Sequence, residues 1–210
     1  MKRESDLLSA EVFGASRETE ARLRDYLALL RRWNARINLV ADAPEEEQWH
    51  RHVLDSLQLL PLLPDAAAPL VDLGSGAGLP GLVLAMATGS ETHLVESDRR
   101  KAAFLTEVVR QLGLGQVRVH PTRIEAARLP PAAVLTARAL APLTDLLAHA
   151  HRLLAPEGVA LFPKGRSVEA ELTAARPAWT MQVERFPSRT DPSATILRVR
   201  EISPVRASAA

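Results

Sequence analysis

The chain has 210 residues, 47% of them hydrophobic and 24% charged, which suits one folded domain with a small appendage and excludes extensive disorder. It contains no cysteine, which excludes disulfides, thiolate metal sites and cysteine nucleophiles. With 26 Lys plus Arg against 25 Asp plus Glu the formal net charge is +1, so overall charge does not mark the chain as a nucleic-acid binder.

The beginning of the chain has no targeting signal. Residues 1–10 mix charged and apolar side chains, unlike the apolar run of a secretory signal. No segment approaches the roughly 18 apolar residues that a membrane span needs. We therefore expect a cytoplasmic protein with no membrane partner.

Residues 1–65 predict helices and no strand. Apolar residues recur at steps of three and four between Leu23 and Ile37, the spacing of one helix face, and Ser16 is a candidate N-cap. Asp42 with Glu45 resembles a capping box, which predicts a second helix that stops before Pro61 or Pro64. We expect these helices to form a small N-terminal extension.

From residue 66 onward the pattern changes to short apolar strands that alternate with helices. This rhythm indicates a mostly parallel sheet covered on both faces. The last two strands are joined by a polar loop, which favours an antiparallel hairpin. The predicted strands are 70–73, 92–96, 117–120, 132–135, 158–162, 180–186 and 194–199, and the predicted helices between them are 82–87, 99–112, 142–154 and 167–175.

This order predicts an α/β fold of the class I methyltransferase type, Rossmann-like, with a seven-stranded sheet and a C-terminal antiparallel hairpin. We expect a methyltransferase domain over residues 66–203, after the helical extension of residues 1–65, and a tail over residues 204–210.

A glycine loop follows the first strand directly. Gly74, Gly76 and Gly78 lie between that strand and a helix opened by Pro80, so backbone N–H groups and a helix N-terminus face a ligand. Residues 76–81 also fit the dinucleotide pattern G-x-G-x-x-G, which is weak evidence by itself. The loop therefore predicts a nucleotide-type site.

Two acidic residues favour S-adenosylmethionine over a dinucleotide. Asp72, just before the loop, would repel a pyrophosphate but attract a sulfonium or an ammonium group. Glu96 ends the second strand, where its carboxylate can accept hydrogen bonds from both ribose hydroxyls. Asp98 is better placed as a helix N-cap than as a ligand. The turn after the third strand places Ile124 beside the adenine, and Glu125 follows it.

The turn after the fourth strand, residues 136–141, faces the transferred methyl group in this fold. It contains no Asn-Pro-Pro-Tyr or Asp-Pro-Pro-Tyr sequence, and no cysteine is present to attack a pyrimidine. A nucleophile that needs no deprotonation, such as guanine N7, fits best, because catalysis then needs placement more than a general base. We expect Arg138 to hold the cofactor carboxylate or a phosphate.

The chain resembles the ribosomal RNA small subunit methyltransferase G family, also called glucose-inhibited division protein B. The resemblance covers nearly the whole chain and is most specific in residues 52–57 and 76–81. It also includes Trp33-Asn34, Asn38-Leu39, Asp72 to Gly81, Glu96-Ser97, Lys101, Phe104-Leu105, Arg123-Ile124-Glu125, Arg138-Ala139 and Lys164-Gly165.

The resemblance implies methyl transfer from S-adenosylmethionine to N7 of one guanine in bacterial 16S ribosomal RNA, free or in the 30S subunit, by a monomer. It implies cofactor contacts at Gly74, Leu79, Ile124, Glu125 and Arg138. These join Asp72, Gly76, Gly78 and Glu96 as the candidate cofactor site.

We take Lys164, Arg138 and Asn38 as candidate catalytic residues. Lys164, Arg123 and His52 are the candidate RNA contacts, and we expect no metal. His52, Asp55 and Ser56 either tie the N-terminal helices to the sheet or face the substrate. Two other classes of protein stay open: a nicotinamide-dependent oxidoreductase that uses the same glycine loop, and a non-catalytic RNA-binding protein.

Overall fold

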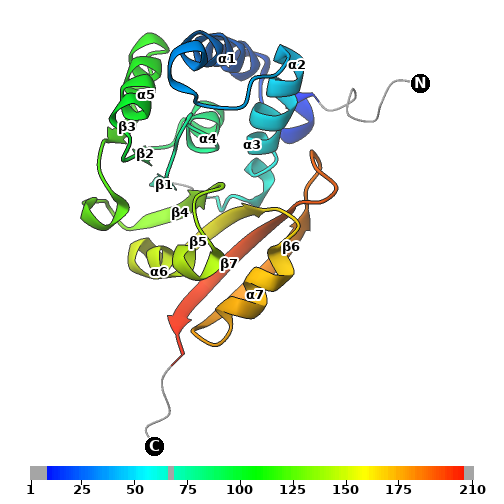
Figure 1. The fold of residues 1–210 in the computed structure, drawn as a ribbon, viewed down its shortest axis with the longest axis vertical. Coiled ribbons are helices and arrows are strands. Elements are labelled where there is room, and N and C mark those ends of the chain that lie inside the picture. Colours follow the sequence, from blue (N-terminus) through cyan, green and yellow to red (C-terminus); the bar gives the residue numbers. More distant parts are fainter. Residues whose placement is uncertain (1–8, 66–68, 206–210) are drawn as a thin grey trace, which may run out of the picture.

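A computed structural model describes residues 9–65 and 69–205 and shows one seven-stranded sheet between two layers of helices (Figure 1). The strands are β1 (Leu70–Leu73), β2 (Thr92–Val95), β3 (Val117–His120), β4 (Ala132–Ala137), β5 (Leu154–Lys164), β6 (Trp179–Pro187) and β7 (Thr195–Pro204). Their order is β3-β2-β1-β4-β5-β7-β6. Strands β1 to β5 pair in parallel, and β7 is antiparallel to both β5 and β6. The predicted fold class is confirmed.

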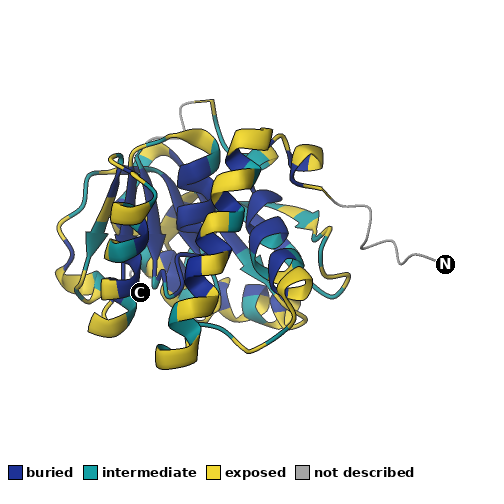
Figure 2. Cartoon of the chain, turned by 90° about the horizontal axis from the view of Figure 1, so that it is seen from above, coloured by how far each residue is buried: buried dark blue, intermediate teal, exposed yellow. Residues whose placement is uncertain are grey.

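Helices cover both faces of the sheet. The helices α4 (Gly81–Thr88) and α5 (Arg99–Gln111) pack on one face, and α6 (Leu143–Leu153) and α7 (Val168–Ala175) pack on the other (Figure 1). All residues of β1 and β2 are buried, as expected for parallel strands covered on both sides. Figure 2 shows this buried sheet behind helices whose exposed residues face outward.

The N-terminal extension forms a further helical layer over α4 and α5. It consists of η2 (Ala10–Phe13), α1 (Arg17–Ile37), α2 (Glu45–Gln48), the π-helical segment η3 (Trp49–Leu54), α3 (Asp55–Leu57) and η4 (Leu60–Leu62). Apolar residues of α1, η3, α4 and α5 share one core. The extension therefore belongs to the same folded body as the sheet.

The observed ends of the elements confirm some predictions and correct others. Ser16 caps α1, since its Oγ accepts a hydrogen bond from the N–H of Thr19 at 3.1 Å. The second helix begins at Glu45 after Pro44 and has no side-chain cap, so the capping role predicted for Asp42 is wrong. Near the C-terminus of the chain, β7 extends to Pro204, beyond the end of the predicted strand at residue 199, because Pro204 pairs with Trp179. A short helix, η5 (Ile124–Ala126), was not predicted.

The order of the strands creates a crevice between β1 and β4. The chain leaves β1 towards α4 on one face of the sheet, and it leaves β4 towards α6 on the other face. At such a switch point the two loops diverge beyond the carboxyl ends of the strands, and ligands of open α/β sheets bind there. The glycine loop and residues 138–142 form the two sides of this crevice.

Tyr26 connects the extension to the glycine loop. Its side chain is fully buried in α1, and its hydroxyl donates a hydrogen bond of 2.7 Å to the carbonyl oxygen of Ala77. Burial raises the pKa of Tyr26, so the hydroxyl stays protonated as this bond requires. No helix among residues 9–65 and 69–205 is long and apolar enough to cross a bilayer.

Replacing Tyr26 with Phe should destabilise the protein by about 1–2 kcal/mol, because the buried carbonyl of Ala77 loses its donor while the ring stays in place. Urea unfolding measures the change, and Val12→Ala, at an exposed position of η2, is the control. Equal stability of Tyr26→Phe and the wild type would show that this hydrogen bond does not stabilise the fold.

Candidate functional site

The glycine loop leaves bare backbone at the end of β1. Gly74 and Gly76 have φ angles of +62° and +56°, in the left-handed region that favours glycine. A Cβ added at Gly76 would meet nothing closer than the Gly74 carbonyl oxygen at 3.8 Å. The space above Gly76 is therefore open, and a ligand can approach its backbone closely.

Asp72 lies beneath the loop, fully buried, and lines neither of the cavities described below. Its Oδ1 accepts a hydrogen bond of 2.6 Å from the hydroxyl of Thr136 on β4, and its Oδ2 has no partner in the described structure. Burial raises the pKa of Asp72 to about 6, although the hydrogen bond from Thr136 opposes this shift. Asp72 thus joins β1 and β4 at the point where their loops diverge.

Glu96 connects the glycine loop to the turn after β2. Its Oε2 accepts a hydrogen bond from the N–H of Gly76 at 2.8 Å, and its Oε1 accepts one from the N–H of Asp98 at 2.7 Å. Asp98 caps α5 as predicted, accepting from the N–H groups of Arg100 and Lys101. The carboxylate of Glu96 is therefore fixed in place beside the open space over Gly76.

The smaller of two neighbouring cavities lies on this side of the crevice, with a volume of about 350 Å³. Five of the predicted cofactor residues and the predicted RNA contact Arg123 line it. The lining residues are Gly74, Gly76, Val95, Glu96, Ser97, Lys101, Thr122, Arg123, Ile124, Glu125, Ala139 and Leu140. Residues from the ends of β1, β2, β3 and β4 thus meet in one place, with apolar surface for a ring and a carboxylate for hydroxyl groups.

The larger cavity, about 820 Å³, lies on the other side of residues 138–142. Three cations line it: Arg51, Arg138 and Lys164. Each is held by a carboxylate, at 2.9 Å from Glu47, 3.0 Å from Asp55 and 2.7 Å from Glu171 respectively. Three carboxylates, Asp55, Glu171 and Asp191, line the cavity as well. The cavity is thus wide and lined by charges of both signs, which suits a polar, phosphate-bearing substrate better than an apolar one.

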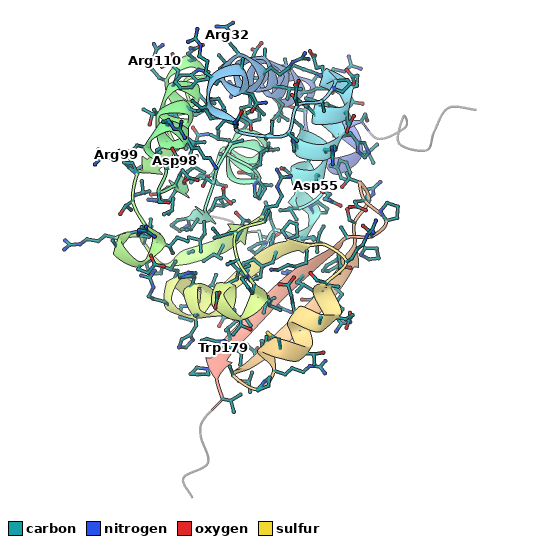
Figure 3. The ribbon with its side chains drawn as sticks, in the orientation of Figure 1. Arg32, Asp55, Asp98, Arg99, Arg110 and Trp179 are labelled. Carbon is teal, nitrogen blue, oxygen red and sulfur yellow. The ribbon has the colours of Figure 1, made fainter. Side chains whose placement is uncertain are left out.

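Asp55 joins three parts of the chain beside this cavity. Its Oδ2 accepts from Arg138 at the end of β4, and its Oδ1 accepts from Gln58 at 2.8 Å and from Thr190 in the β6–β7 loop at 2.7 Å. Figure 3 shows Asp55 on the helical extension near the tip of that hairpin. Asp55 therefore ties these three parts together, and it also lines the larger cavity, so the structure keeps both roles that the sequence leaves open for it.

His52 faces Arg138 and lines neither cavity. Its Nδ1 lies 3.5 Å from Nη2 of Arg138, and burial together with that guanidinium lowers the pKa of His52 to about 4. The ring is neutral at physiological pH and can accept from Arg138. Ser56 is buried, and its hydroxyl donates to the carbonyl of His52 within the helix.

Lys164 is held at the end of β5, and only 9% of its side chain is exposed. Its Nζ donates to Glu171 and, at 3.0 Å, to the carbonyl oxygen of Ala141. Glu171 also accepts from the N–H of Leu143. Burial would raise the pKa of Glu171, but the hydrogen bonds from Lys164 and Ser167 hold it below its ordinary value. Glu171 therefore stays ionised, and its pair with Lys164 anchors residues 141–143.

The remaining predicted site residues lie away from both cavities. Gly78 and Leu79 are packed into the start of α4, where a Cβ on Gly78 would lie 2.3 Å from Leu82. Asn38 is exposed at the C-terminus of α1 with a φ of +44°. Sequence reasoning missed Glu171, which lies on the next helix after Lys164, and Thr190, whose partner Asp55 is distant along the chain. Leu140 lies in the turn that the sequence did single out.

Comparison with known proteins identifies the family. The family described as rRNA small subunit methyltransferase G, or GidB, matches residues 19–195. A protein of Rhodospirillum centenum described as ribosomal RNA small subunit methyltransferase G is 58% identical over 192 residues, which cover 91% of this chain and 88% of that protein. The chain belongs to the methyltransferase G family.

Solved structures agree with this assignment at the level of the fold. A SAM-dependent methyltransferase of Aquifex aeolicus is 15% identical with a TM-score of 0.59, covering 75% of this chain and 93% of that one. An O-methyltransferase of Bacillus cereus in complex with SAH is 17% identical with a TM-score of 0.56, covering 84% and 91%. The methyltransferase G chain thus has the class I methyltransferase fold that its sequence predicts.

Replacing His52 with Gln should remove one source of acid sensitivity from this methyltransferase G chain. The folded-state pKa of about 4 lies below the ordinary histidine pKa of 6.5, so the unfolded chain binds the proton first as the pH falls. His52 therefore makes the folded state progressively less stable from pH 6.5 down to 4. Over this window the wild type should lose stability relative to His52→Gln, whose amide oxygen can still accept from Arg138.

Denaturant unfolding at a series of pH values measures this difference. The raised pKa of Asp72 acts in the opposite direction but is common to both proteins, so it cancels in the comparison. Stability profiles that run parallel over the whole range would show that His52 titrates normally in the folded protein.

Proposed function

We propose that this chain transfers a methyl group from S-adenosylmethionine to N7 of a guanine in bacterial 16S ribosomal RNA. One observation carries the proposal: two cavities meet at residues 139–140, one lined by the glycine loop, Glu96 and Ile124, the other by three cations and three carboxylates. The first suits an adenosine and the second a nucleotide. Membership of the methyltransferase G family supports ribosomal RNA of the small subunit as the substrate.

The residues of the smaller cavity fit S-adenosylmethionine. The open space over Gly76 admits a ligand against the backbone, Ile124 offers an apolar face to the adenine, and Glu96 offers carboxylate oxygens at the ribose. Bound there, the cofactor supplies a methyl group on a positively charged sulfur. Arg138 lines the adjoining cavity rather than this one, so we assign it to the tie with Asp55 and to the wall of the substrate cavity.

Guanine N7 suits the chemistry that these residues offer. The N7 lone pair forms the new bond to the methyl carbon while the carbon–sulfur bond breaks, and the bonding electrons go to sulfur. The base becomes cationic and loses no proton. No general base is therefore needed, and the chain's part is to hold the guanine in line with the methyl group.

The test is methyl transfer with the site of modification identified. Purified protein, tritium-labelled S-adenosylmethionine and 30S subunits or free 16S RNA from a strain lacking this protein should give labelled RNA, and mass spectrometry should find 7-methylguanosine. Binding of NADH but not of S-adenosylhomocysteine would instead favour an oxidoreductase. Cofactor binding without transfer to either RNA would favour a non-catalytic role.

Glu96→Gln should weaken S-adenosylhomocysteine binding by about tenfold or more, because a charge-assisted acceptor at the ribose is lost. Calorimetry measures the affinity. Glu157→Gln, at an exposed position of β5 that lines neither cavity, is the matched control. Equal affinity of Glu96→Gln and the wild type would remove Glu96 from the proposed cofactor site.

Lys164→Gln should reduce RNA methylation by about tenfold while S-adenosylhomocysteine affinity stays nearly constant, because a cation facing the RNA is lost. The substitution also breaks the pair with Glu171. Glu171→Gln breaks the same pair but keeps the ammonium group, so it is the control. An equal loss of methylation in both variants would show that the pair, and not the cation, matters.

A further inference from the structure

Leu140 lies between the two cavities. Only Ala139 and Leu140 line both of them within residues 9–65 and 69–205. Leu140 is 37% exposed. Among all the residues that the structure describes, it is one of three large hydrophobic residues that are exposed. An exposed leucine thus lies where the proposed cofactor cavity meets a cavity lined by charged side chains.

The side chain of Leu140 rests on the bare backbone of the glycine loop. A Cβ added at Gly74 would lie 2.5 Å from Cδ1 of Leu140, a distance that real atoms do not tolerate. A side chain at position 74 would therefore have to displace Leu140, and the φ of +62° independently favours glycine there. The contact crosses the crevice from the loop after β4 to the loop after β1, so it bridges the line along which the two cavities meet.

The backbone on either side of Leu140 is held in place. Before it, Arg138 is paired with Asp55. After it, the carbonyl of Ala141 accepts from Lys164, and the N–H of Leu143 donates to Glu171. Ala139 has a φ of +52°, a left-handed conformation that its surroundings must maintain. The backbone is thus fixed at several points, and the side chain of Leu140 is the part that can turn.

Methyl transfer requires an open path between the cavities. The reacting atoms must come within about 3–3.5 Å, with nothing between them. In the present conformation the Leu140 side chain covers Gly74, on the cofactor side of that path. A change of leucine rotamer is fast and costs little compared with moving the anchored loop.

We propose that Leu140 is a gate between the cofactor cavity and the RNA cavity. When the site is empty, the side chain closes over Gly74. When the cofactor enters, the side chain turns into the larger cavity, and in that cavity it packs against the guanine. This inference rests on the proposed function and adds a residue that controls entry and keeps water from the methyl group until the base arrives.

The test compares the rates of S-adenosylhomocysteine binding, measured by surface plasmon resonance on the full-length protein. Leu140→Ala leaves the passage open, so both the association and the dissociation rate should rise several-fold. Leu140→Met, with similar volume, should restore rates close to those of the wild type. Val12→Ala, an exposed apolar position in η2 that lines neither cavity, should change neither rate.

The possible results of these measurements test the gate separately from the proposed methyltransferase function on which it rests. A wild type that binds S-adenosylhomocysteine and methylates RNA, with an association rate unchanged in Leu140→Ala, overturns the gate alone. A faster dissociation rate by itself would make Leu140 an ordinary contact and also overturn the gate. A wild type that neither binds S-adenosylhomocysteine nor methylates RNA overturns the proposed function and the gate together.

Discussion

The divergence of the chain at the ends of β1 and β4 is the constraint on which the site depends. The two strands are parallel neighbours, with Asp72 beside Thr136 in register, but their loops leave towards helices on opposite faces of the sheet. Neither loop can cover the gap between them. The protein uses this gap for two cavities and leaves one small contact, Leu140 on Gly74, across it.

The cations at the larger cavity form ion pairs that hold parts of the protein together, and they also contribute positive charge to the cavity wall. Arg138 and Lys164 are paired with Asp55 and Glu171, and these pairs anchor the loop after β4 from two sides. Surface ion pairs contribute little stability, but these side chains are mostly screened from water and carry further hydrogen bonds. They fix the geometry of the cavity wall, because each pair links two elements of the fold.

The N-terminal extension is part of the site rather than a separate appendage. Tyr26 reaches the carbonyl of Ala77 in the glycine loop, and Asp55 connects Arg138 with Thr190 of the β6–β7 loop. The extension therefore supports the cofactor side through one contact and one wall of the larger cavity through the other. Burial keeps the hydroxyl of Tyr26 protonated, so that it can donate to Ala77. Burial also keeps His52 neutral beside Arg138, the partner of Asp55. Both connections therefore hold at physiological pH.

The sequence by itself determined the fold class, the order of strands and helices along the chain, and several residues that line the smaller cavity. Hydrophobic period and glycine position are local signals, and Gly74, Gly76, Glu96 and Ile124 follow directly from the ends of strands. Tertiary structure decided what each charged residue does. A sequence shows that Asp72, Arg138 and Lys164 stand near strand ends, but their partners Thr136, Asp55 and Glu171 come from other elements. The contact of Leu140 with Gly74 joins two loops far apart in the chain, and only the packing of β1 beside β4 brings them together.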